Sequence, residues 1–499
     1  MEAIEMKNQG SHRLKSIKES PLYSIVNPRS VVFFGASNKF TAMGTSLLSS
    51  LKAIGFEGNI YPVHPNEERI QDLKAYKSVM DLPEAGDLAV MVLPTHLVPD
   101  VLEECGKKGI RHAIVVSGGF KEVGGEGVEL ERRLKGVAKK YGIRFLGPNC
   151  IGVANPYHKL NTTFFQDLTA PGFIGMASQS GSFITQMFDY LSKFGLGFST
   201  GISVGNEADI DIVDCMEYLD ACPNTRVIGL YLETIRRGRT FVERARSIAP
   251  RKPIVAFYAG GSEAGKKASL SHTGALAGPD PLYDGVFRQS GVIRAHSIEE
   301  LFDFCWVLGA CPKPEGNRVI IQTHSGGPGV ATADACGRAD LDLPALSSET
   351  LEKLAPFIPR TGSLSNPVDL TFTKNPLDYF FNIPKVLMEE KNADGLLIYL
   401  LVPTKTVLRG LESLGIPKDQ LEEQAAGLIE VQCDAIAGLT KNHHRPLIGY
   451  SYRTRGDLFI RGLQDRGIPV LPSPERAARA MQALVTYTRL RESILARGH

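Results

Sequence analysis

The stretch VVFFGAS, residues 31–37, joins an uninterrupted apolar run to a turn of small residues. Two similar apolar runs follow at residues 88–93 and 113–116, and longer amphipathic stretches separate them. Consecutive apolar positions are typical of parallel strands that helices cover on both faces. The pattern predicts a doubly wound α/β sheet for the first domain.

Turns of small or polar residues follow the predicted strands of this domain. In open α/β sheets, ligands bind just beyond the carboxyl ends of the strands. We therefore predict a ligand site at this edge of the sheet. Its candidate residues form four turns: Gly35, Ala36 and Ser37; His64, Pro65 and Asn66; Pro94 and Thr95; and Ser117, Gly118 and Gly119.

The remainder of the chain opens twice in the same way. A strand at residues 173–176 leads into SQSGS (178–182), and a strand at 319–322 leads into HSGGPG (324–329). Later matches between the two segments indicate two diverged copies of one fold. Each turn opens a helix, whose first N–H groups and dipole favour an anion. The candidate phosphate-binding residues are Ser178, Gln179, Ser180 and Gly181, and Ser325, Gly326 and Gly327.

The 499 residues are too many for one core, since a domain usually holds roughly 100–200 residues. We predict a leader at residues 1–24 and three domains at residues 25–155, 156–311 and 312–499. The leader lacks the apolar core of a secretory signal. The longest apolar stretch, near residues 396–402, is far shorter than a membrane span. We therefore expect no membrane association.

Charge and cysteine content exclude two further classes of protein. A net charge of +2 leaves no excess positive charge for a nucleic acid. The eight cysteines lie far apart, with no spacing typical of a metal site, so we expect reduced thiols in a cytoplasmic protein without a bound metal.

A nicotinamide cofactor is disfavoured by the first turn. The glycine after Gly35 is Gly44, which breaks the GxGxxG pattern. HPN (64–66) follows the second strand without the acidic residue that would hold a ribose. Phosphate binding remains open, because it needs only backbone N–H groups, to which the side chain of Lys39 could add; a turn with a purely structural role is an equal alternative.

The clearest chemical signal is His272, which small residues and glycines surround in ASLSHTGALAG (268–278). A neutral, accessible imidazole can act as a nucleophile and carry a phosphoryl group. The two predicted helix starts could supply N–H groups to that phosphoryl. Glu233, at the end of the strand at 227–232, could orient the other imidazole nitrogen, although a solvated loop carboxylate is an equal alternative.

The stretch SHTGALAG (271–278) resembles the phosphohistidine signature of ADP-forming acetyl-CoA synthetases, relatives of succinyl-CoA synthetase. Further matching stretches extend over most of the chain: GAS (35–37), YPVHPN (61–66), GGFKEVG (118–124), GPNCIG (147–152), SQSG (178–181), SVGNEAD (203–209) and YLE (231–233). The resemblance implies a Rossmann-like CoA-binding domain followed by two flavodoxin-like ligase domains. It also implies that His272 is the phosphorylated residue and Glu233 its partner.

The implied reaction interconverts acyl-CoA, phosphate and ADP or GDP with an acid, CoA and ATP or GTP, through an acyl phosphate and phosphorylated His272. Residues expected to bind CoA are Gly35, Ala36, Ser37, Lys39, His64, Pro65, Asn66, Pro94, Thr95, Ser117, Gly118, Gly119 and Asn149. The acid is a small carboxylic acid that the sequence does not specify.

The nucleotide of this family is bound by an ATP-grasp domain, and every segment of the chain is already assigned. We expect a separate ATP-grasp β subunit in a heterotetramer, with Mg²⁺ accompanying the nucleotide there. Three positions depart from the family pattern: Met43 and Tyr258 replace common lysines, and Leu270 replaces a small residue. A catalytically silent CoA or acyl-CoA sensor is the alternative function, but it has no need of His272 or Glu233.

Overall fold

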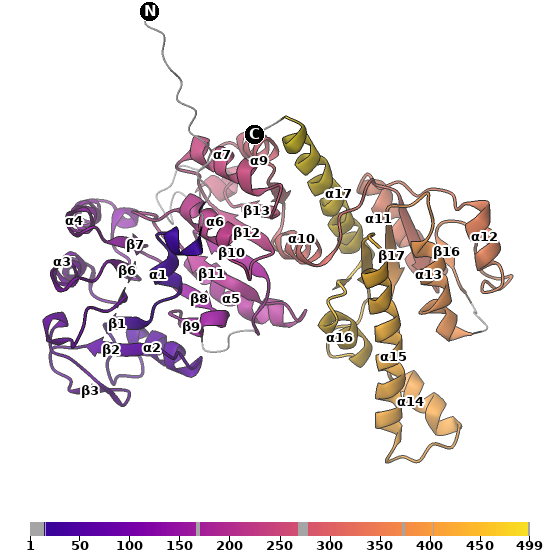
Figure 1. Cartoon of the computed structure of the whole chain (residues 1–499), viewed down its shortest axis with the longest axis horizontal. Helices are drawn as coiled ribbons and strands as arrows, with labels where there is room; N and C mark the ends of the chain where they lie inside the picture. Colours follow the sequence, from indigo (N-terminus) through magenta and orange to yellow (C-terminus); the bar gives the residue numbers. More distant parts are fainter. Residues whose placement is uncertain are drawn as a thin grey trace, which may run out of the picture. The chain divides into compact units, whose positions relative to one another are not determined.

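The computed structural model describes residue 14 and residues 16–165, 170–267, 278–371, 375–402 and 404–497. The chain divides into two compact units, coloured along the sequence in Figure 1. Of the described residues, the first unit contains those from 14 to 189 and from 197 to 294, and the second contains those from 190 to 196 and from 295 to 497.

Five parallel strands form the first sheet of the first unit, in the order β2-β1-β5-β6-β7. Their bounds are β1 (Ser30–Phe34), β2 (Asn59–Val63), β5 (Leu88–Met91), β6 (His112–Val115) and β7 (Arg144–Leu146). Every residue of β1 and β5 is buried, as expected for strands covered on both faces. The predicted Rossmann-like α/β sheet is confirmed, and its turns follow the strands at one common edge.

Four helices accompany this sheet: α1 (Tyr23–Val26), α2 (Met43–Ala53), α3 (Val98–Lys108) and α4 (Glu126–Tyr141). Figure 1 shows α3 and α4 side by side, and both contribute to one apolar cluster with the strands, through Leu102 and Leu134. A short hairpin of β3 (Arg69–Ile70) and β4 (Leu73–Lys74) follows β2.

Seven strands form the second sheet, in the order β14-β13-β12-β10-β11-β8-β9. Their bounds are β8 (Val153–Asn155), β9 (Leu160–Asn161), β10 (Ile174–Ser178), β11 (Phe198–Ser203), β12 (Val227–Leu232), β13 (Ile254–Tyr258) and β14 (Ile293–Ala295). The parallel run β11-β10-β12-β13 has the flavodoxin-like winding. The helices of this part include α5 (Gly181–Ser192), α6 (Ile212–Ala221), α7 (Gly238–Ile248) and α9 (Asp280–Ser290).

The two sheets of the first unit share one apolar core, which includes Val31 from β1 and Leu230 from β12. The carboxylate of Asp209 adds a polar link, because it accepts a hydrogen bond from the backbone N–H of Phe145 at 2.9 Å. The predicted limit at residue 155 coincides with the end of β8, which pairs with β11. The domain limits at 24, 155 and 311 stay predictions.

The second unit repeats the flavodoxin-like winding in a parallel sheet of order β16-β15-β17-β18-β19, as predicted. Its strands are β15 (Val319–Thr323), β16 (Val368–Asp369), β17 (Gly395–Tyr399), β18 (Leu447–Tyr450) and β19 (Val470–Leu471). Its helices are α10 (Ile298–Ala310), α11 (Gly326–Arg338), α12 (Ser348–Leu354), α13 (Asn382–Met388), α14 (Thr404–Ser413), α15 (Leu421–Asn442), α16 (Leu458–Asp465) and α17 (Pro474–Ala496). Among the residues described, none of the helices has the length and apolarity that crossing a bilayer requires.

The turn after β1 depends on glycine at position 35. Gly35 has a φ of +90°, and a Cβ atom there would lie 1.9 Å from the carbonyl oxygen of Val92. We expect Gly35→Ala to lower the free energy of unfolding by at least about 2 kcal/mol, measured by urea denaturation followed by circular dichroism. Gly55→Ala is the matched control, since Gly55 has a φ of +77° but no neighbouring atom within 4 Å. Equal losses in the two variants would contradict this account of the turn.

Candidate active site

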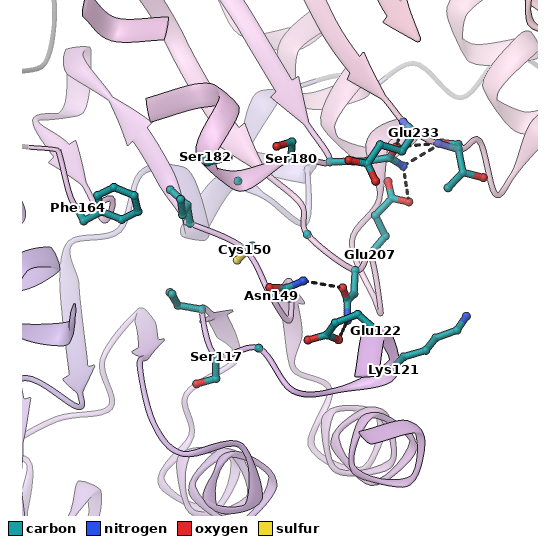
Figure 2. A pocket seen from close by; sticks show the side chains of 18 of the residues that line it. Ser117, Lys121, Glu122, Asn149, Cys150, Phe164, Ser180, Ser182, Glu207 and Glu233 are labelled. Carbon is teal, nitrogen blue, oxygen red and sulfur yellow. Dashed lines mark hydrogen bonds between the residues drawn. The ribbon is translucent and has the colours of Figure 1, made fainter. Parts of the chain in front are cut away.

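A cavity of about 680 Å³ lies in the first unit, where loops after the strands of both sheets meet. Figure 2 shows Ser117 and Glu122 on the side of the first sheet and Ser180 and Glu233 on the side of the second. The predicted site residues that line it are Ser117, Gly118, Asn149, Gln179, Ser180, Gly181 and Glu233. Residues predicted to bind CoA and residues predicted to bind phosphate therefore share one cavity.

The remaining predicted residues lie elsewhere. The following belong to the loops of the first sheet but do not line the cavity: Gly35, Ala36, Ser37, Lys39, His64, Pro65, Asn66, Pro94, Thr95 and Gly119. Ser178 is fully buried at the end of β10, and Ser325, Gly326 and Gly327 belong to the second unit at the start of α11. His272 and Leu270 lie outside the described residues.

The turn after β6 contains two adjacent glycines, of which Gly118 lines the cavity beside Ser117. Thr95 donates a hydrogen bond to the carbonyl of Gly118 at 2.5 Å, and the Glu122 carboxylate accepts one from the N–H of Gly119. A Cβ atom at Gly119, whose φ is +93°, would lie 2.8 Å from the Thr95 hydroxyl. Two consecutive glycines at a strand end fit the close approach of a large ligand such as CoA.

Asn206 links the loops of the two sheets across the cavity wall. Its Nδ2 donates to Oε2 of Glu122 at 2.6 Å, and its Oδ1 accepts a hydrogen bond from Nδ2 of Asn149 at 3.4 Å. Dashed lines in Figure 2 mark both contacts. These side chains hold the loop after β11 against the loops after β6 and β7.

Helix α5 begins at Gly181, almost directly after β10. The Ser178 hydroxyl shapes the turn, since it donates to the carbonyl of Ser180 at 2.7 Å and accepts from the N–H of Ser180 at 3.1 Å. Ser180, Gly181 and Ser182 line the cavity. The first N–H groups of a helix have no carbonyl one turn earlier to bind, so this helix start can bind an anion.

Glu233 follows the last residue of β12 and lines the cavity, with 8% of its surface exposed. Its backbone N–H, and that of Thr234 at 3.0 Å, donate to Oε1 of Gln179. Nε2 of Gln179 donates to the carbonyl of Thr234 and to the carboxylate of Glu207, both at 2.9 Å. Gln179 thus supports the strand end that carries Glu233, and its predicted contact with phosphate stays a prediction.

Glu207 is a buried carboxylate at the cavity wall, with 6% of its surface exposed. Its Oε1 accepts a hydrogen bond from the N–H of Ile212 at 2.9 Å, at the start of α6. Burial raises the pKa of Glu207 to about 7, although the nearby Arg236 favours the ionised form. The group can therefore change charge near neutral pH.

Cationic side chains at the cavity come from Lys121 and Arg236. Arg236 donates through Nη1 to the carbonyl of Glu207 at 2.8 Å, and its Nε lies 3.5 Å from Oε2 of the same residue. Because 39% of the Arg236 side chain remains exposed, it can also attract a phosphate or a carboxylate.

The structure shows the surroundings of two residues that depart from the family pattern, Tyr258 and Met43. Tyr258 stacks on Tyr283, with ring centroids 3.5 Å apart, and its hydroxyl donates to the carbonyl of Gly278 at 3.0 Å. Burial raises the pKa of Tyr258, so this position carries no charge near neutral pH. Met43, 56% exposed at the start of α2, lines the cavity.

Sequence reasoning assigned no role to Lys121, Glu122, Asn206, Glu207 or Arg236. The first four lie inside GGFKEVG and SVGNEAD, two of the stretches that carry the family resemblance. The resemblance indicated that these two stretches matter for the family. The structure adds that the loops after β6 and β11, which contain them, lie together at the cavity. Arg236 lies beyond YLE and carries no signal in the sequence.

Family models match three segments of the chain. They are a CoA binding domain at residues 29–156, a succinyl-CoA ligase like flavodoxin domain at 171–308 and a Ligase-CoA domain at 319–402. The alpha subunit of the ADP-forming acetate–CoA ligase II of Pyrococcus furiosus is 38% identical to the chain, over 92% of this chain and 96% of its own length. The chain belongs to the ADP-forming acetate–CoA ligase family.

Other members of the acetate–CoA ligase family agree. The ADP-forming acetate–CoA ligase I of Archaeoglobus fulgidus is 38% identical over 93% of this chain, which corresponds to 63% of that longer protein. The solved acetyl-coenzyme A synthetase 1 of Ca. Korarchaeum cryptofilum, in complex with phosphate and ADP, superposes with a TM-score of 0.84 at 33% identity. That match covers 96% of this chain and 99% of the other, so the ligase fold extends over nearly the whole chain.

Proposed function

We propose that this chain is the CoA-binding, phosphohistidine-carrying α subunit of an NDP-forming acyl-CoA synthetase. The observation that carries the proposal is the single cavity where the Ser117-Gly118 turn, the start of α5 and Glu233 meet. CoA binds along the loops of the first sheet, and the phosphate that reacts with its thioester binds at the start of α5.

In the proposed reaction, phosphate attacks the thioester carbonyl of acyl-CoA, which forms an acyl phosphate and releases CoA. A nitrogen of His272 then attacks the phosphorus, and the carboxylic acid leaves. The phosphoryl group passes from His272 to ADP or GDP and forms ATP or GTP. Every step is reversible, so the same groups serve acyl-CoA synthesis.

The charges of the site suit this chemistry. The N–H groups at the start of α5 and the guanidinium of Arg236 stabilise the phosphoryl oxygens. We assign to Glu233 the role of accepting the other N–H of the His272 imidazole, which keeps the attacking nitrogen unprotonated. The helix start at Ser325, Gly326 and Gly327 is the proposed second group of phosphoryl donors.

The nucleotide is expected on a separate ATP-grasp β subunit, in a heterotetramer, with Mg²⁺ bound beside the nucleotide. The Pyrococcus furiosus relatives are named as alpha subunits, which supports a partner chain. Free cysteines suit the proposed cytoplasmic location. Relatives are named for acetate and for 4-hydroxybutyrate, so acetyl-CoA is the first acyl-CoA to test.

We expect the purified chain, free of other proteins, to form no ATP from acetyl-CoA, phosphate and ADP, but to take up a labelled phosphoryl group from labelled phosphate and acetyl-CoA. The chain can start the reaction, but the acceptor nucleotide binds elsewhere. Luciferase detection of ATP and autoradiography of the chain measure the two outcomes.

The control for that experiment is the same mixture after addition of an ATP-grasp β subunit of the family, which should restore ATP formation. ATP formation by the chain alone would contradict the need for a partner. A chain that binds CoA but takes up no label would support the silent sensor.

A further inference from the structure

The carboxylate of Glu207 faces hydrogen-bond donors on both of its oxygens. Oε1 accepts from the N–H of Ile212 at 2.9 Å, and Oε2 accepts from Nε2 of Gln179 at 2.9 Å. Nε of Arg236 lies 3.5 Å from Oε2. With both oxygens accepting, the ionised form of Glu207 matches its surroundings.

These contacts determine which way the amide of Gln179 points. Its Nε2 must face the acceptors, which are Glu207 and the carbonyl of Thr234. Its Oε1 must then face the donors, which are the backbone N–H groups of Glu233 and Thr234. A rotation of the amide by half a turn would set donor against donor at the N–H groups of Glu233 and Thr234, and acceptor against acceptor at Glu207 and the carbonyl of Thr234.

We propose that Glu207 is a positioning residue of the phosphoryl-transfer site, acting through Gln179 on the backbone at Glu233. This inference rests on the proposed function, because it assumes that Glu233 supports the phosphoryl acceptor. Glu207 holds the amide of Gln179 in one orientation, and that amide holds the end of β12 so that Glu233 stays at the cavity.

The charged groups around Glu207 act in opposite directions on its ionisation. Arg236, after β12, favours the carboxylate, as do the hydrogen bonds from Ile212 and Gln179. Burial favours the protonated acid most strongly and Asp211, just before α6, adds to it, so the pKa of Glu207 is raised to about 7. Protonation of Glu207 puts a hydrogen on a carboxylate oxygen that accepts a hydrogen bond in the structure. The contact between Glu207 and Gln179, and with it the support that Gln179 gives to the backbone at Glu233, therefore weakens as the pH falls through about 7.

Glu207→Gln tests the proposal with little change in volume. The new amide has one donor end, which must meet the N–H of Ile212 or the amide of Gln179. We expect this variant to take up label from phosphoryl-labelled acetyl phosphate about 10- to 100-fold more slowly than the wild-type chain at pH 8. The affinity for CoA, measured by calorimetry, should change less than about twofold, because the CoA loops belong to the first sheet.

The pH profile separates positioning from a merely structural role. The ratio of wild-type to variant rates should be largest above pH 7 and fall toward one as the pH is lowered to 6, because the wild-type Glu207 then loses its charge. Taking the ratio cancels the titration of the phosphorylated residue itself. A structural defect would lower the rate by the same factor at every pH.

A control and a second variant complete the experiment. Asp394→Asn removes another buried carboxylate, one that pairs with Arg318 in the second unit and has no contact with Gln179, and it should leave the labelling rate unchanged. The exchange Gln179→Glu with Glu207→Gln should recover part of the labelling lost in Glu207→Gln, about threefold or more. A carboxylate at 179 can accept from the N–H groups of Glu233 and Thr234 and from the amide at 207, whereas the carbonyl of Thr234 loses its donor.

Each result has one meaning. Labelling by Glu207→Gln at the wild-type rate, a constant ratio from pH 6 to 8, or no recovery in the exchange variant would overturn the proposal. If Glu207→Gln fails to fold, the exchange variant is compared with Gln179→Ala instead. An exchange variant that folds, as judged by a wild-type circular dichroism spectrum, but is labelled no faster than Gln179→Ala would overturn the proposal. Absence of label on the wild-type chain would instead contradict the proposed function.

Discussion

The variant His272→Ala should lose ATP formation by at least about 10³-fold in the presence of the β subunit, while its affinity for CoA stays within about twofold of the wild-type value. The imidazole is the proposed phosphoryl carrier, so no other group can pass the phosphoryl to the nucleotide. The CoA loops belong to the first sheet and keep their structure. Coupled ATP assays and calorimetry measure the two quantities.

His444→Ala is the matched control for that variant, because His444 is an exposed histidine in the second unit. It should retain full activity. If His272→Ala retained more than about a tenth of the wild-type rate, the phosphohistidine mechanism would be wrong. Loss of both activity and CoA binding would point to a folding defect instead.

The second large effect is expected from Glu233→Gln, which should slow phosphoryl uptake about 10- to 100-fold. The carboxylate is the proposed acceptor for the second imidazole N–H, and a neutral amide stabilises the phosphorylated imidazolium less well. Glu233 lies at a strand end and fills no apolar core, so the midpoint of urea unfolding should change little. Rapid-quench labelling with phosphoryl-labelled acetyl phosphate gives the rate.

Glu243→Gln serves as the control for the loss of one negative charge, since Glu243 is exposed on α7. Its labelling rate should equal that of the wild-type chain. A Glu233→Gln chain that is labelled at the wild-type rate would show that the carboxylate at the end of β12 has no part in phosphoryl transfer.

The sheets were predictable because their signal is local. The apolar run at the start of VVFFGAS is typical of a strand that is buried on both faces. The similar strand-to-helix turns SQSGS and HSGGPG indicated that the flavodoxin-like winding occurs twice. The same reasoning located the turns after β6 and β10, which line the cavity, because parallel strands bring their carboxyl ends to one edge; the predicted turns after β1, β2 and β5 do not line it.

The contacts that organise the site were not predictable from spacing. Gln179 and Glu207 lie on loops after different strands, β10 and β11, so their hydrogen bond depends on how those loops fold. Asn206 likewise donates a hydrogen bond to Glu122, although the two residues lie on loops of different sheets and are far apart in the sequence. The sequence showed only that Tyr258 stands where the family often has a lysine. In the structure its ring stacks on Tyr283 and its hydroxyl donates a hydrogen bond to the carbonyl of Gly278.

The central claim is that this chain carries the phosphoryl group on His272. The most direct test is to incubate the purified chain with labelled phosphate and acetyl-CoA, digest it under alkaline conditions and locate the label by mass spectrometry. We predict one label that is stable to base, labile to acid and confined to the peptide that contains His272. A label on any other residue, or a label that survives acid and is lost in base, would contradict the account.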